Sequence, residues 1–215
     1  VGEVTGDGMM VVKNHGEVIA TVPAAKLADD APLYHRDSKE PAYLEQTRAL
    51  RLDDIPALAD TQAALAKLLS WPTIASKNWV YRQYDHMVRA NTMVNPGSDA
   101  AVIRVKSDSI PGAGNSKDRN GSFPEKILAI SVDCNAVHVY LDPYEGAKAA
   151  VAECARNLAC SGAAPIGTTD NLNFGNPHNP ELFWQLKESV RGLAEGCEKF
   201  NAPVTGGNVS LYNQN

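Results

Sequence analysis

The pattern of hydrophobic and polar positions changes near residue 96, and this change divides the chain. Before it, residues 9–12 and 17–22 have the β-branched composition of short strands, and glycine-containing turns separate them. Residues 3–5 resemble a further strand. We therefore expect the chain to begin with a small strand-rich segment.

Residues 46–95 have a pattern typical of helices. Thr61 is a plausible N-cap for a helix whose alanine and leucine residues recur on one stripe. A second helix is expected over residues 75–87, which carry several aromatic side chains. Packing between domains is the simplest role for these aromatic rings. The segment is interpreted as a helical connector.

From residue 96 onward, short apolar runs alternate with longer amphipathic segments, which is typical of an α/β arrangement. A stretch rich in serine, glycine, asparagine and charge interrupts the alternation over residues 107–126, where we expect a long surface loop. A helix is predicted over residues 144–159. The pattern predicts five strands, at residues 100–105, 127–133, 137–141 and 165–169 and from residue 203 onward.

The last predicted helix has a clear beginning. Asn179 suits the N-cap, Pro180 suits the first turn, and Glu181 complements the helix dipole. Gly192 and Gly196 inside this helix each cost about 1 kcal/mol relative to alanine. We therefore expect another element to pack closely against both glycines.

Composition excludes several classes of function. The 215 residues carry a net charge of −5 and no block of basic residues, so a nucleic-acid or anionic-membrane surface is not the main function. No run approaches the roughly 20 apolar residues that span a bilayer. The four cysteines form no C-x-x-C pair and lack a histidine at zinc-site spacing. We expect reduced, mostly buried thiols in a cytoplasmic protein.

Two segments carry the candidate chemistry, residues 168–177 and residues 205–210. Each is expected to be a loop at the carboxyl end of a strand, where α/β proteins bind ligands. Asp170 offers an anionic oxygen, Asn208 a neutral carbonyl oxygen and Ser210 a hydroxyl. The glycines at 206 and 207 let backbone N–H groups approach an anion.

These residues allow two interpretations. Together the two segments would hold a metal-bridged nucleotide phosphate. Alternatively, aspartate, asparagine and glycine form ordinary tight turns. Spacing alone leaves both open.

A resemblance favours the first interpretation. The segments T-D-N-L-N-F-G-N-P from Thr169 and G-N-V-S-L-Y-N from Gly207 resemble phosphoribosylformylglycinamidine synthase subunit II, the standalone synthetase subunit of purine biosynthesis. Further segments resemble the same family in order along almost the whole chain. They begin at Gly2, Ala31, Tyr84, Pro96, Tyr140, Ala152 and Phe183.

The resemblance implies the fold and the domains. It implies an α+β (two-layer α/β) fold of the aminoimidazole-ribonucleotide-synthetase N-terminal type, a mixed sheet packed by helices. The family has two halves, each an A domain followed by a B domain. Residues 1–45 would end the first B domain, residues 46–95 would connect, and residues 96–215 would form the second A domain. The absence of an initiator methionine agrees with an internal fragment, which we expect to be inactive alone.

The family converts formylglycinamide ribonucleotide to its amidine. ATP phosphorylates the amide oxygen, and ammonia displaces the phosphate, so ATP and Mg²⁺ are the implied cofactors. The implied partners are a glutaminase subunit, which supplies ammonia from glutamine, and a small assembly subunit. Phosphoryl transfer needs positioning and charge neutralisation, which suits the polar residues of the two segments.

The resemblance also implies roles for individual residues. Asp170 and Gly207 would contact ATP, Asn208 would bind Mg²⁺, and Ser210 would contact the substrate. The family's catalytic base is a histidine of the first A domain, so no catalytic residue is assigned here.

The long single-chain relatives have an auxiliary nucleotide site that contains metal. By resemblance, its metal ligands would be Asp99, Glu153 and Asn157. Glu153 and Asn157 are four residues apart and share a helix face, which joint ligation requires. The alternative is that they are two polar residues on a solvated face.

Two departures from the family are expected to touch none of the residues with implied roles. Asn171 stands where the family often has cysteine, and residues 107–126 are longer than the usual connection, which affects the local geometry there. Two other functions remain open. The chain could be a structural and pairing domain with silent nucleotide contacts, which could also self-associate. It could alternatively belong to another ATP-using synthetase of the superfamily.

Overall fold

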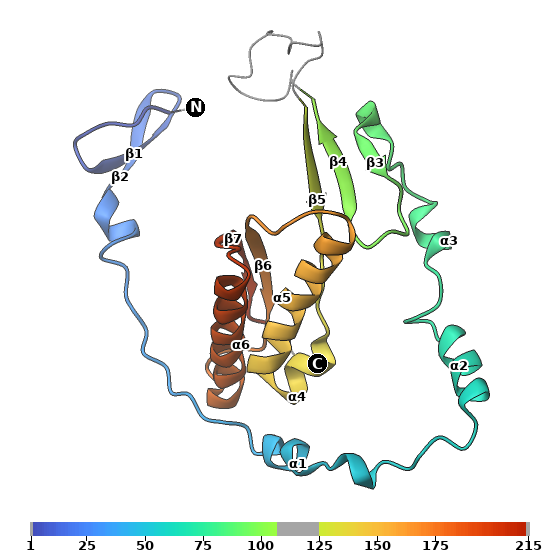
Figure 1. The fold of residues 1–215 in the computed structure, drawn as a ribbon. Coiled ribbons are helices and arrows are strands. Elements are labelled where there is room, and N and C mark those ends of the chain that lie inside the picture. The colour runs from blue at the N-terminus through green and yellow to red at the C-terminus, as the bar shows by residue number, and fades with distance from the viewer. Residues whose placement is uncertain (1, 107–124, 214–215) are drawn as a thin grey trace. The chain divides into compact units, whose positions relative to one another are not determined.

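The computed structural model describes residues 2–106 and 125–213 (Figure 1). The chain divides into two compact units, Val1–Asp37 and Ser38–Asn215. The loop predicted over residues 107–126 falls almost entirely outside the described residues. Helices and both parallel and antiparallel strands are present, so the predicted α+β class is confirmed.

The first unit is a β-hairpin. Strands β1 (Met9–Asn14) and β2 (Glu17–Pro23) pair antiparallel. His15 and Gly16 both have positive φ, at 48° and 90°, as a two-residue primed turn requires. The strand expected at residues 3–5 is not formed. A short 3₁₀ turn, η1 (Ala24–Leu27), follows the hairpin.

The second unit begins with short helical segments: α1 (Tyr43–Ala49), η2 (Leu52–Asp54), α2 (Thr61–Leu69), α3 (Asn78–Tyr81) and η3 (Val88–Ala90). Asp60, not Thr61, caps α2, since its carboxylate accepts two backbone N–H groups at 2.9 Å. Of the helix predicted over residues 75–87, only α3 is formed, so the rest of that prediction is wrong. Asp85 accepts the N–H of Met87 in a local turn there, which competes with helix formation.

Two small sheets follow. Strands β3 (Thr92–Val94), β4 (Ala101–Val105) and β5 (Lys126–Ile130) form one antiparallel sheet. Strands β6 (Thr168–Asn173) and β7 (Val204–Ser210) pair in parallel and form the other. A parallel pair needs a crossover, and α6 (Pro180–Lys199) provides it.

The strand predicted at residues 137–141 is wrong, because this segment is helix α4 (Ala136–Leu141). Its alternating pattern resembles a strand. However, the Asn135 side chain accepts the N–H groups of Val137 and His138 and caps a helix. Helix α5 (Pro143–Cys160) follows directly, with Asp142 as its N-cap. A Cβ on Gly146 would lie 2.5 Å from the Val139 nitrogen, so α4 and α5 pack tightly.

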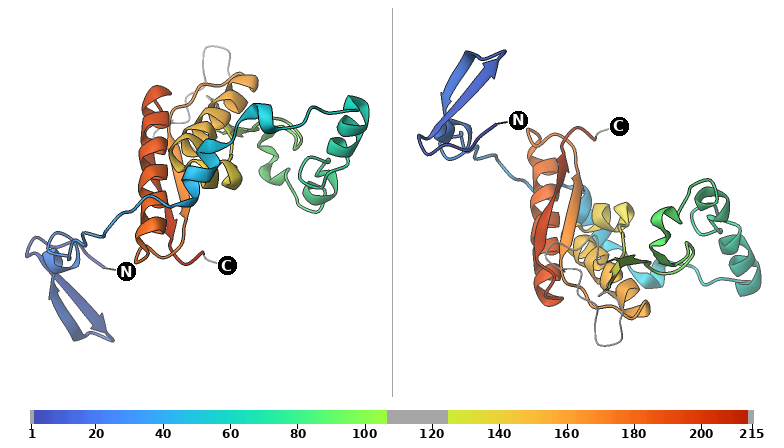
Figure 2. Two further views of the ribbon diagram at one scale, coloured as in Figure 1. Left: turned by 90° about the horizontal axis from the view of Figure 1, so that it is seen from below. Right: turned by 90° about the horizontal axis from the view of Figure 1, so that it is seen from above.

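Helices α5 and α6 form the centre of the second unit and lie side by side in all views (Figures 1 and 2). The close packing predicted for the two glycines of α6 is confirmed. A Cβ on Gly192 would lie 2.1 Å from the main-chain oxygen of Tyr144, and one on Gly196 would lie 3.0 Å from the Val151 Cβ. Asn179 caps α6 as predicted, accepting the Glu181 N–H at 2.9 Å.

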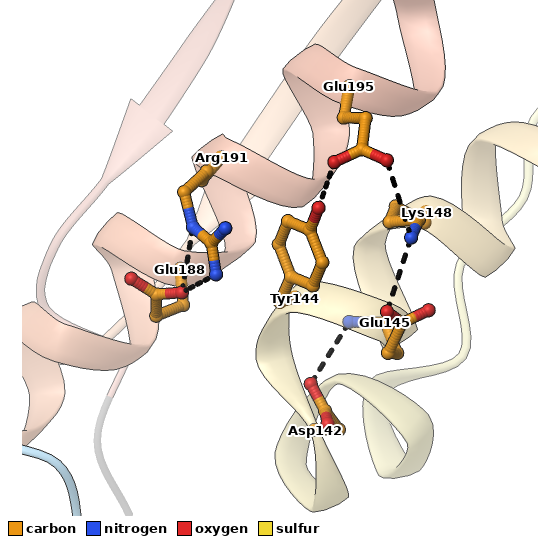
Figure 3. A network of polar contacts seen from close by, with 7 residues as sticks. All are labelled: Asp142, Tyr144, Glu145, Lys148, Glu188, Arg191 and Glu195. Atoms are coloured by element: carbon orange, nitrogen blue, oxygen red, sulfur yellow. Dashed lines mark hydrogen bonds and ion pairs between the residues drawn. The ribbon is translucent and has the colours of Figure 1, made fainter. Parts of the chain in front are cut away.

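A polar network of exposed and half-buried side chains joins the same two helices (Figure 3). The Tyr144 hydroxyl donates to Glu195, and the Arg191 guanidinium stacks 3.9 Å from the Tyr144 ring centroid. Lys148 lies 3.6 Å from Glu195 and 3.2 Å from Glu145. Such surface pairs each contribute little to stability.

Helix α1 packs on this core. Leu44 is only 1% exposed, and the Tyr43 ring stacks on Tyr140 with centroids 4.4 Å apart. The Tyr43 hydroxyl donates to the Tyr140 carbonyl and accepts from Gln185. Burial raises the pKa of the Tyr43 hydroxyl. Residues from Lys39 onward are therefore part of the second unit, since the Lys39 N–H also donates to Pro180.

Candidate functional site

The two motif segments lie side by side. They were predicted to be loops, but most of their residues form strands. Residues 168–173 and 204–210 are the parallel pair β6 and β7, so the prediction of two loops is wrong over most of their length. Asparagine and glycine are depleted in strands, and their abundance here favoured the loop interpretation. Pairing between segments far apart in the sequence overrides that local preference.

Register places Asp170 opposite Gly207, both assigned to ATP by the resemblance. A Cβ on Gly207 would lie 2.1 Å from Asp170 Oδ1 and 2.6 Å from the Asp170 carbonyl oxygen. The Asp170 carboxylate therefore covers Gly207, where any other residue would clash. By contrast, a Cβ on Gly206 would meet nothing within 4 Å.

The opposite face of the pair carries the remaining motif residues. Side chains alternate along a strand, so Asn171 and Asn208 share this face with Asn173 and Ser210. The Asn208 amide nitrogen donates to Asn171 Oδ1 at 3.3 Å. Among the described residues no donor reaches Asn208 Oδ1, a neutral oxygen, and oxygens are the ligands that Mg²⁺ binds. Both asparagines are exposed.

The carboxyl ends of the pair are closed by main-chain bonds. The Phe174 N–H donates to the Ser210 carbonyl at 2.9 Å, and the Asn213 N–H donates to the Phe174 carbonyl at 3.2 Å. Gly175 is buried beside them. The two motifs therefore meet at one point. Sequence reasoning assigned no role to Asn213, although it belongs to the second motif.

The proposed auxiliary ligands are less closely joined. Asp99 is exposed just before β4, and Glu153 is exposed on α5. Asn157, one turn further along α5, donates its amide to Asp133 at 3.0 Å. No hydrogen bond or ion pair joins Asp99, Glu153 and Asn157 to one another in the described part of the chain. Residues 2–106 and 125–213 contain no group of three or more histidine, cysteine, aspartate or glutamate residues suited to a metal.

Asp133 is a polar residue that sequence reasoning missed. Burial works against its ionisation. Hydrogen bonds from Ser131, Cys154 and Asn157 and the charge of Arg156 outweigh that burial and lower the pKa of the Asp133 carboxyl. The position of Asp133 just after β5 was the available signal.

The thiol of Cys154 lies beside this carboxylate. Burial, and then Asp133, raise the pKa of Cys154 to about 11. All four cysteines are free, but Cys134 and Cys160 are exposed, so the expectation of mostly buried thiols is wrong. Among the described helices, none is long and apolar enough to cross a membrane.

Comparisons with known proteins agree with this arrangement. A family described as AIR synthase related protein, N-terminal domain, matches residues 97–215. The structure of PurLQS from Thermotoga maritima matches with a TM-score of 0.65 at 24% identity, covering 99% of this chain and 30% of that one. At this identity the match establishes the fold.

Two further structures from the same organism also match. PurL complexed with AMPPCP has a TM-score of 0.63 at 26% identity, covering 99% of this chain and 30% of that one. PurL complexed with FGAR has a TM-score of 0.60 at 25% identity, covering 97% of this chain and 28% of that one. This chain thus spans about 30% of the length of these relatives.

The organism's protein is described as phosphoribosylformylglycinamidine synthase II, so the resemblance seen in the sequence is confirmed. The family match covers more than half of the chain and includes both motifs. The chain belongs to the AIR synthase related family and contains its N-terminal domain.

Proposed function

We propose that this chain contributes a nucleotide- and substrate-binding part of an ATP-dependent synthase that converts formylglycinamide ribonucleotide to its amidine. The pairing of Asp170 with Gly207 in the β6–β7 register carries the proposal, because it brings together the two residues that the resemblance assigns to ATP. The similarity to PurL structures complexed with AMPPCP and with FGAR supports both ligands.

The motif residues would bind different ligand groups. Asp170 and Gly207 would contact ATP, and Ser210 would contact the ribonucleotide. Asn208 Oδ1, which accepts no hydrogen bond from the described residues, would hold Mg²⁺, which neutralises phosphate charge when bound. Asp99, Glu153 and Asn157 would form an auxiliary metal site, with Asp133 orienting the Asn157 amide.

The reaction would proceed by transfer of the ATP γ-phosphate to the amide oxygen. Ammonia would then add to the carbon, and phosphate would leave. This chain would hold and orient the reactants. A glutaminase subunit would supply the ammonia and a small subunit would assist assembly, in line with the PurLQS match.

The domain assignment belongs to the same proposal. Residues 1–45 would end a B domain, 46–95 would connect, and 96–215 would form the second A domain. The isolated chain would then lack turnover, because the base lies elsewhere in the family.

The full-length product of the gene, assayed for ADP release with ATP, Mg²⁺, ammonia and formylglycinamide ribonucleotide, tests the proposal. We expect release to require the ribonucleotide, and Asp170→Asn to raise the KM for ATP at least about tenfold. ADP release that is independent of the ribonucleotide would contradict the proposed reaction. Unchanged kinetics in Asp170→Asn would remove this residue from the ATP site.

A second candidate is a pairing domain with silent nucleotide contacts. Large apolar side chains exposed around β5 and β7 favour it: Ile127 is 62% exposed, Ile130 52% and Val209 54%. Light scattering of the full-length product with and without ATP distinguishes the two. Association without ribonucleotide-dependent ADP release would favour pairing.

A further inference from the structure

Asn213 lies three residues beyond Ser210, and its side chain folds back onto that residue. Its Nδ2 atom lies 2.9 Å from Ser210 Oγ and 3.1 Å from the Ser210 carbonyl oxygen. Its backbone N–H donates to Phe174, which ties the same residue to the end of β6. Asn213 is therefore held in place from both motifs.

These contacts determine the direction of the hydrogen bonds. A carbonyl oxygen only accepts, so the Asn213 atom that faces it must be the NH₂ group, not the amide oxygen. The same NH₂ group faces Ser210 Oγ, so the hydroxyl accepts this bond. A hydroxyl has one proton, and that proton must point elsewhere.

The Ser210 proton has no acceptor in the described part of the chain. Ser210 is half-buried at the carboxyl end of β7, on the face that also carries Asn208. The Ser210 hydroxyl can therefore donate a hydrogen bond to a ligand outside the protein. Oxygens of a phosphorylated ligand accept such bonds strongly.

We propose that Asn213 is a positioning residue: by donating to Ser210 Oγ it directs the Ser210 proton toward an oxygen of the bound ribonucleotide. This inference rests on the proposed function, in which Ser210 contacts that substrate. Asn213 itself would contact no ligand. It would affect substrate binding only by orienting the Ser210 hydroxyl.

Replacing the donor with an acceptor gives the sharpest test. In Asn213→Asp the carboxylate would accept from Ser210 and draw its proton away from the substrate. In Asn213→Ala the hydroxyl would only lose its orientation. We expect the KM for the ribonucleotide to rise at least about tenfold with aspartate and only severalfold with alanine, while kcat and the KM for ATP change little.

A double-mutant cycle in the full-length product separates positioning from a structural role. If Asn213 acts through Ser210, Asn213→Asp should add little to the KM once Ser210→Ala has removed the hydroxyl. Asn135→Asp is the matched control, since a carboxylate caps α4 as well as the amide does. It should leave both KM values unchanged.

The outcomes are distinct. No ribonucleotide-dependent ADP release by the wild type would overturn the proposed function and this inference with it. Release by the wild type, with equal KM in Asn213→Asp and wild type, would overturn only the positioning role. So would a tenfold effect of Asn213→Asp that persists undiminished in the Ser210→Ala background.

Discussion

Gly207→Ala is the substitution whose consequence the structure determines most directly. The new methyl group would lie 2.1 Å from Asp170 Oδ1, 2.7 Å from its Cγ and 2.6 Å from its main-chain oxygen. The carboxylate can rotate away, but the carbonyl belongs to the paired strand and cannot. Strands β6 and β7 must therefore separate locally, and Asp170 must leave its position. Overpacking of this kind costs about 1–3 kcal/mol.

Gly206→Ala is a matched control on the adjacent residue of the same strand. A methyl group at this position would meet no atom within 4 Å, and the φ of Gly206 is not positive. Alanine there should leave stability unchanged or raise it by up to about 1 kcal/mol, by restricting the unfolded chain.

Scanning calorimetry and ATP kinetics of the full-length product test the pair. We expect Gly207→Ala to lower the melting temperature and to raise the KM for ATP, and Gly206→Ala to leave the melting temperature unlowered. Equal melting temperatures and equal KM values in the two variants would refute the close approach of Asp170 to Gly207. A loss of stability with normal ATP kinetics would confirm the packing and refute the role of this contact in binding ATP.

Three further predictions rest on single contacts. Asn171→Ala removes the acceptor that orients Asn208, and the Mg²⁺ concentration for half-maximal ADP release should rise about two- to fivefold, because a hydrogen bond of 3.3 Å contributes modestly. An unchanged Mg²⁺ response would exclude this orienting role. Gly192→Ala places a methyl 2.1 Å from a main-chain oxygen of α5 and should lower the melting temperature, which calorimetry measures; an unaltered melting temperature would contradict the tight packing of α5 and α6. At pH 8 iodoacetamide should modify exposed Cys134 well before Cys154, whose pKa of about 11 leaves roughly one thiol in a thousand ionised, and peptide mass spectrometry would reveal the reverse order if the burial were wrong.

The helices show what local sequence predicts well. The start of α6 followed from Asn179 and its next two residues, because capping involves atoms only a few residues apart. The need for close packing at Gly192 and Gly196 was also readable, since glycine inside a helix is costly unless space demands it. The sequence did not indicate that α5 would be the helix packed against these glycines, because tertiary contacts determine which helices pack together.

Two of the errors have different physical causes. Residues 137–141 alternate like a strand but form α4, because the Asn135 cap and the α5 surface favour a helix. Residues 168–173 look like a loop but form β6, because β7 provides its hydrogen bonds. For β6 the deciding interactions lie far away in the sequence, outside the window that a periodicity argument examines. For α4 the Asn135 cap is local, and the alternating pattern outweighed it in the prediction. The family resemblance identified the motif residues without depending on either assignment.

The strand pairing also revises how the motif residues can cooperate. In two loops, Asp170 and Asn208 could turn toward one ligand. In paired strands they sit in adjacent register positions, so alternation sends their side chains to opposite faces. Asp170 and Gly207 therefore lie on one face of the strand pair, whereas the side chains of Asn208 and Ser210 lie on the other. Asn213 donates a hydrogen bond to the Ser210 hydroxyl at the carboxyl end of β7. A ligand that used all four residues would have to reach around the carboxyl ends of both strands, where the backbone bonds of Phe174 join the motifs. The end of this strand pair, and not either face alone, is where nucleotide and substrate groups would have to meet.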